Sequence, residues 1–431
     1  MFAFNRVLAA VGALLASGSA HAASAMIGPL PVDFILFAAV LAGVAVFNRH
    51  SLRVALIGVV VISVYKIFIA EFAASGGGIN GYVGHLAHEW VLLANLFFLL
   101  VGFALLSNHF EQSHIPKVLP HFLPDDWKGG FVLLVLVFVL SSFLDNIAAA
   151  LIGGTVASAV FRKKVHVGYL AGIVAASNAG GSGSVVGDTT TTMLWIAGAS
   201  PLAVLHAYAA AIVALIIVGV IAAKQQHGYS PIIKDARAGH QVDWMRVGIV
   251  FWILGIAIVA NVMINLRFAA LGEQFPVLGF AVWAAILIAL PIRKPDWSVL
   301  PSATRGAVFL LSLVLCASMM PVEELPKASW QTALGLGFVS AVFDNIPLTA
   351  LAIKQGGYDW GMLAYCVGFG GSMVWFGSSA GVALASQFPE ARNALQWVKQ
   401  GWHVALAYVV GFFVMLAITG WVPTPLRAAS S

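Results

Sequence analysis

The sequence predicts an all-α polytopic membrane protein, organised as an inverted-topology repeat with two re-entrant helical hairpins and two discontinuous transmembrane helices. Composition is the first indication: of 431 residues, 61% are hydrophobic and only 9% are charged, with a mean hydropathy of +0.95. Ordinary soluble domains contain about 25% charged residues. Two further observations, a pair of duplicated polar motifs and the distribution of Lys and Arg among the loops, predict how the helices are arranged.

Composition also excludes several classes of function. The net charge of +5 comes from basic residues in short loops, where membrane orientation explains them better than a nucleic-acid partner. Cys316 and Cys366 both lie in apolar surroundings, which favours buried thiols over a disulfide framework. The longest polar loop, 224–246, carries no phosphate-binding motif. We therefore expect no enzyme, no cofactor and no nucleic-acid binding.

Residues 1–22 have the pattern of a cleaved secretory signal. Arg6 precedes an apolar run over 7–15, and Ala20-His21-Ala22 supplies small residues for cleavage. The alternative is a short, uncleaved first helix. A cleaved signal makes the chain enter its first span from outside, as in a bacterial-type inner (plasma) membrane.

Eight continuous apolar stretches are long enough to cross a bilayer. They are 29–47, 52–71, 90–107, 201–223, 247–266, 277–292, 303–321 and 401–422. Four other apolar stretches contain a polar interruption: 130–161, 165–199, 330–355 and 361–386. We expect these four to form broken helices.

The interruptions are two motifs, each written twice. Asp145-Asn146 and Asp344-Asn345 interrupt the first stretch of each pair, while Gly180-Gly181-Ser182 and Gly370-Gly371-Ser372 interrupt the second. An ionisable group within a membrane span costs roughly 2.5–3.5 kcal/mol on insertion scales. Two copies at matching places indicate one polar site assembled from two related halves. We assign the halves to 29–223 and 247–422, joined by a cytoplasmic linker over 224–246.

The loop charges predict that the halves are inverted. Most Lys and Arg fall on the inner side only if both Asp-Asn segments are hairpins that return to the side they left. Lys128 and Arg162 then flank the first hairpin on the inside, and Lys327 and Lys354 flank the second on the outside. Inverted repeats with broken helices are the usual plan of a secondary transporter with a site near the bilayer midplane.

Broken helices leave backbone groups unpaired, so protein, water or an ion must satisfy them. Gly permits the backbone angles at a break, and Ser, Thr, Asn and Asp supply ligand oxygens. The candidate ion- or substrate-binding residues are Asp145, Asn146, Ser177, Asn178, Ser182, Asp188, Thr189, Asp344, Asn345, Ser372, Ser378 and Ser379. Asp145, Asp188 and Asp344 are the candidate Na⁺ ligands.

Each candidate has a structural alternative. Asp145 and Asp344 are also suited to cap the second helix of a hairpin. Asp188 has Ser378 as its counterpart, so it is the best single candidate for a carboxylate that exchanges a proton for a cation. In the run that follows it, we assign Thr189 to the site, while Thr191 and Thr192 are expected to bond to carbonyls of their own helix.

These motifs resemble the ion-transporter superfamily, especially sodium/proton antiporters of the NhaD type. The resemblance rests on the Asp-Asn pairs, Ser177-Asn178-Ala179-Gly180-Gly181, the stretch from Gly187 to Ile196, and the stretch from Gly370 to Gly381. It implies Na⁺ or Li⁺ and H⁺ as the transported ions and also implies a homodimer. Relatives in the superfamily carry citrate, dicarboxylates or arsenite on the same scaffold.

Two functional hypotheses follow. The first is Na⁺(Li⁺)/H⁺ antiport by alternating access; the alternative is a carrier of citrate or another organic anion, with or without cation coupling. Three buried acids, and no basic residue expected inside the membrane, favour a cation over a bare anion. Lys66 is expected to extend toward the outer membrane surface rather than to be buried.

Overall fold

The computed structural model describes residues 26–27, 30–47, 50–70, 72, 76–118, 123–185, 187–233, 241–322 and 325–426. The predicted signal, residues 1–22, lies outside these ranges. Within them the protein is helical, apart from two-residue strands β1 (Met26–Ile27) and β2 (Leu30–Pro31), which pair antiparallel. The prediction of an all-α protein is confirmed for the described residues.

Ten helices make up the first half of the described chain. They are α2 (Val32–Val46), α3 (Ser51–Phe68), α4 (Gly78–Gln112), α5 (Ile115–Val118), α6 (Trp127–Ser141), α7 (Asn146–Val160), α8 (Val167–Ser182), α9 (Thr189–Ile196), α10 (Pro201–Leu205) and α11 (Ala207–Tyr229).

The second half begins after the linker. Its elements are α12 (Trp244–Arg267), α13 (Ala269–Gln274), α14 (Val277–Ala289), η3 (Trp297–Val299), α15 (Leu300–Ser318), α16 (Trp330–Ser340), α17 (Asn345–Gln355), α18 (Trp360–Gly370), α19 (Ser379–Gln387), η5 (Pro389–Arg392), α20 (Ala394–Gln400) and α21 (Trp402–Thr419).

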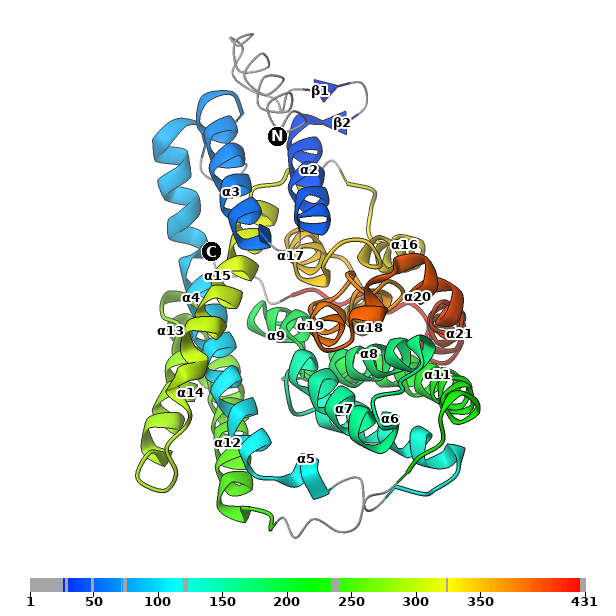
Figure 1. Ribbon diagram of the computed structural model, residues 1–431. Coiled ribbons are helices and arrows are strands. Elements are labelled where there is room, and N and C mark those ends of the chain that lie inside the picture. Colours follow the sequence, from blue (N-terminus) through cyan, green and yellow to red (C-terminus); the bar gives the residue numbers. More distant parts are fainter. Residues whose placement is uncertain are drawn as a thin grey trace.

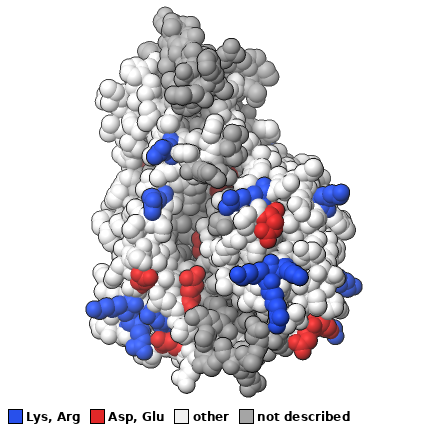
Figure 2. Space-filling model, viewed as in Figure 1, with Lys and Arg blue, Asp and Glu red and all other residues white. Residues whose placement is uncertain are grey.

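Six of these segments are long and apolar enough to cross a membrane, among the residues that the structure describes. They comprise α3, α4, the segment from α10 to α11, α12, the segment from η3 to α15, and α21. Figure 2 shows one face of the molecule, on which uncharged residues predominate and charged side chains are sparse. Length, hydropathy and surface together describe a multi-pass membrane protein.

The four predicted interruptions are real helix breaks. One helix ends and another begins at 142–145 between α6 and α7, at 183–188 between α8 and α9, at 341–344 between α16 and α17, and at 371–378 between α18 and α19. The helix α7 packs closely on α6. A side chain added at Gly153 of α7 would lie only 2.4 Å from Cγ2 of Val137 on α6. The first Asp-Asn motif therefore sits at the tip of a helical hairpin.

The helix α4 is longer than the sequence predicts, since it begins at Gly78 rather than near residue 90. Hydropathy missed this part because it contains His85, His88 and Glu89. The structure gives these polar residues local partners or a cavity to line: His85 contacts the Ser318 hydroxyl at 3.0 Å, and His88 and Glu89 line a cavity. A helix that carries polar groups is stable in such surroundings.

The helices form two bundles that lie side by side (Figure 1). The scaffold bundle, defined as α2, α3, α4, α12, α14 and α15, is held by packing of α3 and α4 on α15 and of α12 and α4 on α14. The core bundle, defined as α6, α7, α8, α11, α16, α18, α19 and α21, has α11 packed on α21 and α8 packed on α18. The short helices α9 and α17 lie between the bundles and contact α4 and α15, respectively.

One expectation about the scaffold bundle was wrong. Lys66 does not extend to the membrane surface; its side chain is 3% exposed, and its Nζ lies 2.9 Å from Oδ1 of the fully buried Asp33. The ammonium also lies over the ring of Phe72, 5.9 Å from its centroid. Burial becomes tolerable for the lysine because a carboxylate on α2 compensates its charge. A buried basic residue therefore exists, and it lies away from the candidate site.

Candidate functional site

Each Asp-Asn motif begins the helix that follows its break, and both do so in the same way. Oδ1 of Asp145 accepts a hydrogen bond from the backbone N–H of Ile147 at 2.7 Å, and Oδ1 of Asp344 accepts one from Ile346 at 3.0 Å. Both aspartates are thus N-caps, of α7 and of α17. Capping uses one carboxylate oxygen, and the other remains available for further contacts.

The Gly-Gly-Ser motifs allow close approach of neighbouring helices. A side chain at Gly180 would lie 2.0 Å from the carbonyl oxygen of Phe138 on α6, and one at Gly370 would lie 2.3 Å from that of Gly337 on α16. No larger residue fits at either position without moving backbone. The same close contact, made by α8 on α6 and by α18 on α16, brings each break against the preceding helix.

Asn178 connects the two halves at the centre of the core bundle. Its Nδ2 donates to the hydroxyl of Ser372 at 2.9 Å and to the hydroxyl of Ser378 at 3.1 Å, across the contact between α8 and α18. Its Oδ1 accepts from Nδ2 of Asn146 at 3.1 Å. The carbonyl of Asn146 in turn accepts from the Ser177 hydroxyl at 2.8 Å. Five of the predicted site residues therefore form one buried hydrogen-bonded network.

Asp188 makes a second connection between the halves. It caps α9, accepting from the backbone N–H of Thr190 at 3.3 Å, while its Oδ2 accepts from the Thr190 hydroxyl at 2.9 Å. The same Oδ2 lies 3.5 Å from Nδ2 of Asn345, at the start of α17. The aspartate is 3% exposed, so its carboxylate is held within protein by groups from both halves.

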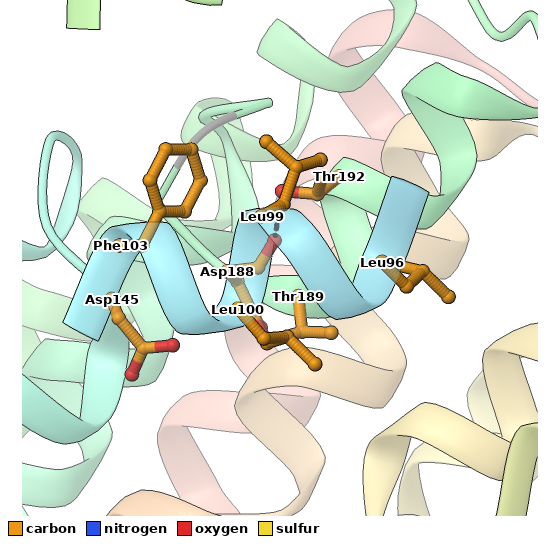
Figure 3. Close-up of a pocket in the computed structure, with 8 residues that line it drawn as sticks. All are labelled: Leu96, Leu99, Leu100, Phe103, Asp145, Asp188, Thr189 and Thr192. Atoms are coloured by element: carbon orange, nitrogen blue, oxygen red, sulfur yellow. Dashed lines mark hydrogen bonds between the residues drawn. The ribbon is translucent and has the colours of Figure 1, made fainter. Parts of the chain in front are cut away.

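A small cavity separates two of the three aspartates from α4 (Figure 3). Asp145, Asp188 and Thr189 line it on one side, and leucines of α4 together with Phe103 line the other. Its volume is about 10 Å³, close to the smallest space that accommodates one water molecule. Two carboxylates around a space of this size are suited to one partly dehydrated cation.

Asp344 does not join this pair. Its Oδ2 accepts from the Ser379 hydroxyl at 3.0 Å, and the two residues line a different cavity of about 300 Å³ beside α2 and α15. Among the described residues, no three His, Cys, Asp or Glu side chains form a metal-binding group. The structure therefore brings two of the predicted Na⁺ ligands together and places the third elsewhere.

The remaining predicted residues lie within or beside this network. The Ser182 hydroxyl donates to the carbonyl of Ala179 at 2.8 Å, in the last turn of α8. Thr191 and Thr192 donate to the carbonyl of Asp188, both at 2.9 Å, as their local role predicts. Their hydroxyls also reach carbonyls of the preceding break.

Two residues of the site escaped the sequence argument. Thr190, rather than Thr189, donates to the carboxylate of Asp188. The signal for it was its place two residues after a helix cap, where a hydroxyl faces the capping side chain. Gly368 is the second: a side chain there would lie 3.6 Å from Oδ2 of Asp188 and 3.4 Å from Cβ of Ser182. A single glycine within an apolar helix carries no comparable signal.

Several known proteins are similar in sequence to this chain. No family model matches the chain. It is 29% identical over 321 residues to sodium/proton antiporter 1 of Arabidopsis thaliana, an alignment that covers 65% of this chain and 52% of that protein. Sodium/proton antiporter 2 of the same plant is 27% identical over 328 residues, covering 66% and 73%. The Na⁺/H⁺ antiporter NhaD of Halomonas elongata is 24% identical over 330 residues, covering 66% of each.

The chain is similar to sodium/proton antiporters of the NhaD type. The resemblance predicted from the motifs is therefore confirmed, and these relatives are antiporters rather than enzymes. The chain spans about half the length of the Arabidopsis thaliana antiporter 1 that it matches.

Proposed function

We propose that the protein exchanges Na⁺ or Li⁺ for H⁺ by alternating access. The observation that carries this proposal is the position of Asp188: a buried carboxylate, held by groups from both halves, shares a space of about 10 Å³ with Asp145. The names of the similar proteins support the same pair of ions.

The proposed architecture is an inverted repeat, 29–223 and 247–422, with re-entrant hairpins formed by α6–α7 and α16–α17. Packing supports it, because several helix contacts recur when the elements of the two halves are exchanged. The helix α6 packs on α8 as α16 packs on α18, α7 contacts α19 as α17 contacts α9, and α3 contacts α15 as α14 contacts α4. Such equivalence is what a duplicated and inverted unit would produce.

In the proposed cycle the cation binds between the carboxylates of Asp145 and Asp188. Thr189, which lines the same cavity, supplies a hydroxyl oxygen. Asn178 and the serines of the second half hold the two breaks together and so fix the distance between the halves. A proton on Asp188 removes the charge that holds the cation, so proton and cation compete for one group. Movement of the core bundle against the scaffold bundle then changes the side from which this group is reached.

The alternative substrate, citrate or another organic anion, has less support. A tricarboxylate requires more room than about 10 Å³ and requires positive groups beside it. The cavity at Asp188 is small and contains two carboxylates instead. The best-supported substrate is therefore a small monovalent cation.

Reconstitution in vesicles that carry a pH-sensitive dye tests the proposal. We expect Na⁺ and Li⁺, each added alone, to release protons across the membrane, and citrate alone to have no effect. Proton movement that requires citrate would refute cation/proton exchange. The variant Asp188→Asn should lose exchange while retaining its fold, whereas Asp126→Asn, at a partly exposed helix cap, should retain both.

A further inference from the structure

A second, larger cavity lies next to the candidate site. Its volume is about 650 Å³, within the range of ligand-accessible pockets. It is bounded by α4 and α15 of the scaffold bundle, by the start of α14, and by α9 and α17. The cavity thus occupies the junction between the two bundles, where one bundle would move against the other.

The walls of this cavity are partly polar and partly apolar. On α4 the polar His88, Glu89 and Asn95 line it together with the apolar Val91 and Leu92. Lys354 on α17 also lines it, and its ammonium donates to the backbone carbonyls of Ser318, at 2.8 Å, and Met320. The polar part suits a hydrated ion, and the positive charge of Lys354 is held at the wall by the carboxyl end of α15.

The large cavity adjoins the space at Asp188 along α4 and α9. Leu92 lines the large cavity and Leu96, one turn further along α4, lines the small one. On α9, Met193 lines the large cavity and the preceding Thr192 lines the small one. Leu96 and Met193 are 1% and 0% exposed and belong to one hydrophobic cluster. Leu96 borders the small cavity and Met193 borders the large one, so these two buried side chains occupy the place where the cavities adjoin.

We propose that the large cavity is the aqueous vestibule by which a monovalent cation reaches Asp188, and that Leu96 and Met193 form a hydrophobic seal between them. Narrow apolar constrictions block ions because water leaves them. A seal of two side chains excludes ions while the cavity behind it stays filled with water. The proposal rests on the proposed function only for the identity of the ion.

Loop charge predicts the side to which the vestibule opens. Lys354, near the end of α17, and Arg267, the last residue of α12, belong to segments that the loop-charge pattern places outside. The cavity at Asp344 and Ser379 lies beside the first turn of α3, which carries Arg53, a residue that the same charge pattern places inside. The vestibule should therefore accept solutes from the outer face of the membrane.

Cysteine labelling tests the vestibule. The native Cys316 and Cys366 are both fully buried, so the unmodified protein gives the background. A reporter Ala197→Cys lies in the wall of the vestibule, and Leu100→Cys lies in the wall of the small cavity. With Ag⁺, a thiol-reactive monovalent cation small enough for the space of about 10 Å³, added outside intact cells, we expect Ala197→Cys to react and Leu100→Cys to react slowly, each measured as loss of free thiol after denaturation.

The seal is tested by combining Leu100→Cys with a second change. Either Leu96→Ala or Met193→Ala should speed labelling by about tenfold or more. Leu105→Ala, a fully buried leucine on the same helix, is the matched control and should leave the rate unchanged. Leu96→Val supplies a milder opening if an alanine variant fails to fold, and it should speed labelling to a smaller extent.

Labelling requires no transport, so the vestibule and the proposed function can fail separately. If Ala197→Cys reacts only from the inner side, or if neither seal variant changes the rate at Leu100→Cys, the vestibule proposal is wrong. If labelling behaves as expected but Na⁺ and Li⁺ move no protons in reconstituted vesicles, the vestibule stands and the identity of the ion is wrong.

Discussion

Nδ2 of Asn178, in the first half of the chain, donates to the hydroxyl of Ser378, in the second half, at 3.1 Å. The same nitrogen donates to Ser372. Both serines lie at the break between α18 and α19, and Ser378 caps α19 by accepting from the N–H of Gly381 at 3.3 Å. One amide thus holds the ends of two broken helices in register.

Replacing this amide should separate the two breaks. Asn178→Ala leaves buried hydroxyls of Ser372 and Ser378 without their donor and should lower the free energy of unfolding by about 1–3 kcal/mol. The same variant should also bind the cation more weakly, and a loss of about 1.4 kcal/mol of binding free energy would lower the affinity tenfold. Thermal unfolding in detergent and dye-based exchange in vesicles measure the two effects. Asn108→Ala, at a part-buried position on α4, is the control, and an equal loss of exchange there would contradict the special role of Asn178.

Gly368→Ala should alter ion binding with little effect on stability. The added methyl would lie 3.4 Å from Cβ of Ser182 and 3.6 Å from Oδ2 of Asp188, which are ordinary contact distances. It would block one direction of approach to the carboxylate, so we expect the apparent Na⁺ affinity to fall by roughly tenfold. Titration of exchange against Na⁺ measures this. Gly335→Ala, whose added methyl meets no atom within 4 Å, should leave the affinity unchanged.

A feature was predicted correctly from the sequence when the residues that form it are near neighbours in the chain, and was missed when they are far apart. Helix positions and breaks follow from hydropathy and from local Gly, Ser and Asp residues, so the four interruptions were located correctly. The start of α4 was missed because His85 and Glu89 lower its hydropathy, although their surroundings make a helix favourable. Asp145 and Asp344 were correctly predicted as caps, since a cap is a contact between near neighbours. Contacts between helices, such as Gly368 against Asp188, depend on packing that no local pattern encodes.

The buried pair between Lys66 and Asp33 is a further contact of this kind. Lys66→Met should lower the free energy of unfolding by about 3–5 kcal/mol, because it leaves a fully buried carboxylate without its counter-charge. The double variant Asp33→Asn/Lys66→Met should recover much of that loss. Lys128→Met, which removes an exposed pair with an N···O distance of 3.9 Å, should change stability by less than about 1 kcal/mol. Chemical unfolding in detergent compares the three, and a double variant as unstable as Lys66→Met would argue against charge compensation.

Equivalent glycines in the two halves should respond equally to substitution. Gly180→Ala would place a methyl 2.0 Å from the carbonyl oxygen of Phe138, and Gly370→Ala would place one 2.3 Å from that of Gly337. Backbone atoms must move to relieve either contact, so each variant should lose about 1–3 kcal/mol of stability. Gly255→Ala, within α12 and without neighbours within 4 Å, should be neutral or gain up to about 1 kcal/mol from its higher helix propensity. Thermal unfolding of the three variants provides the comparison. Similar losses at Gly180 and Gly370 would support a duplicated unit, whereas destabilisation of only one of them would mean that the two breaks are held in different ways.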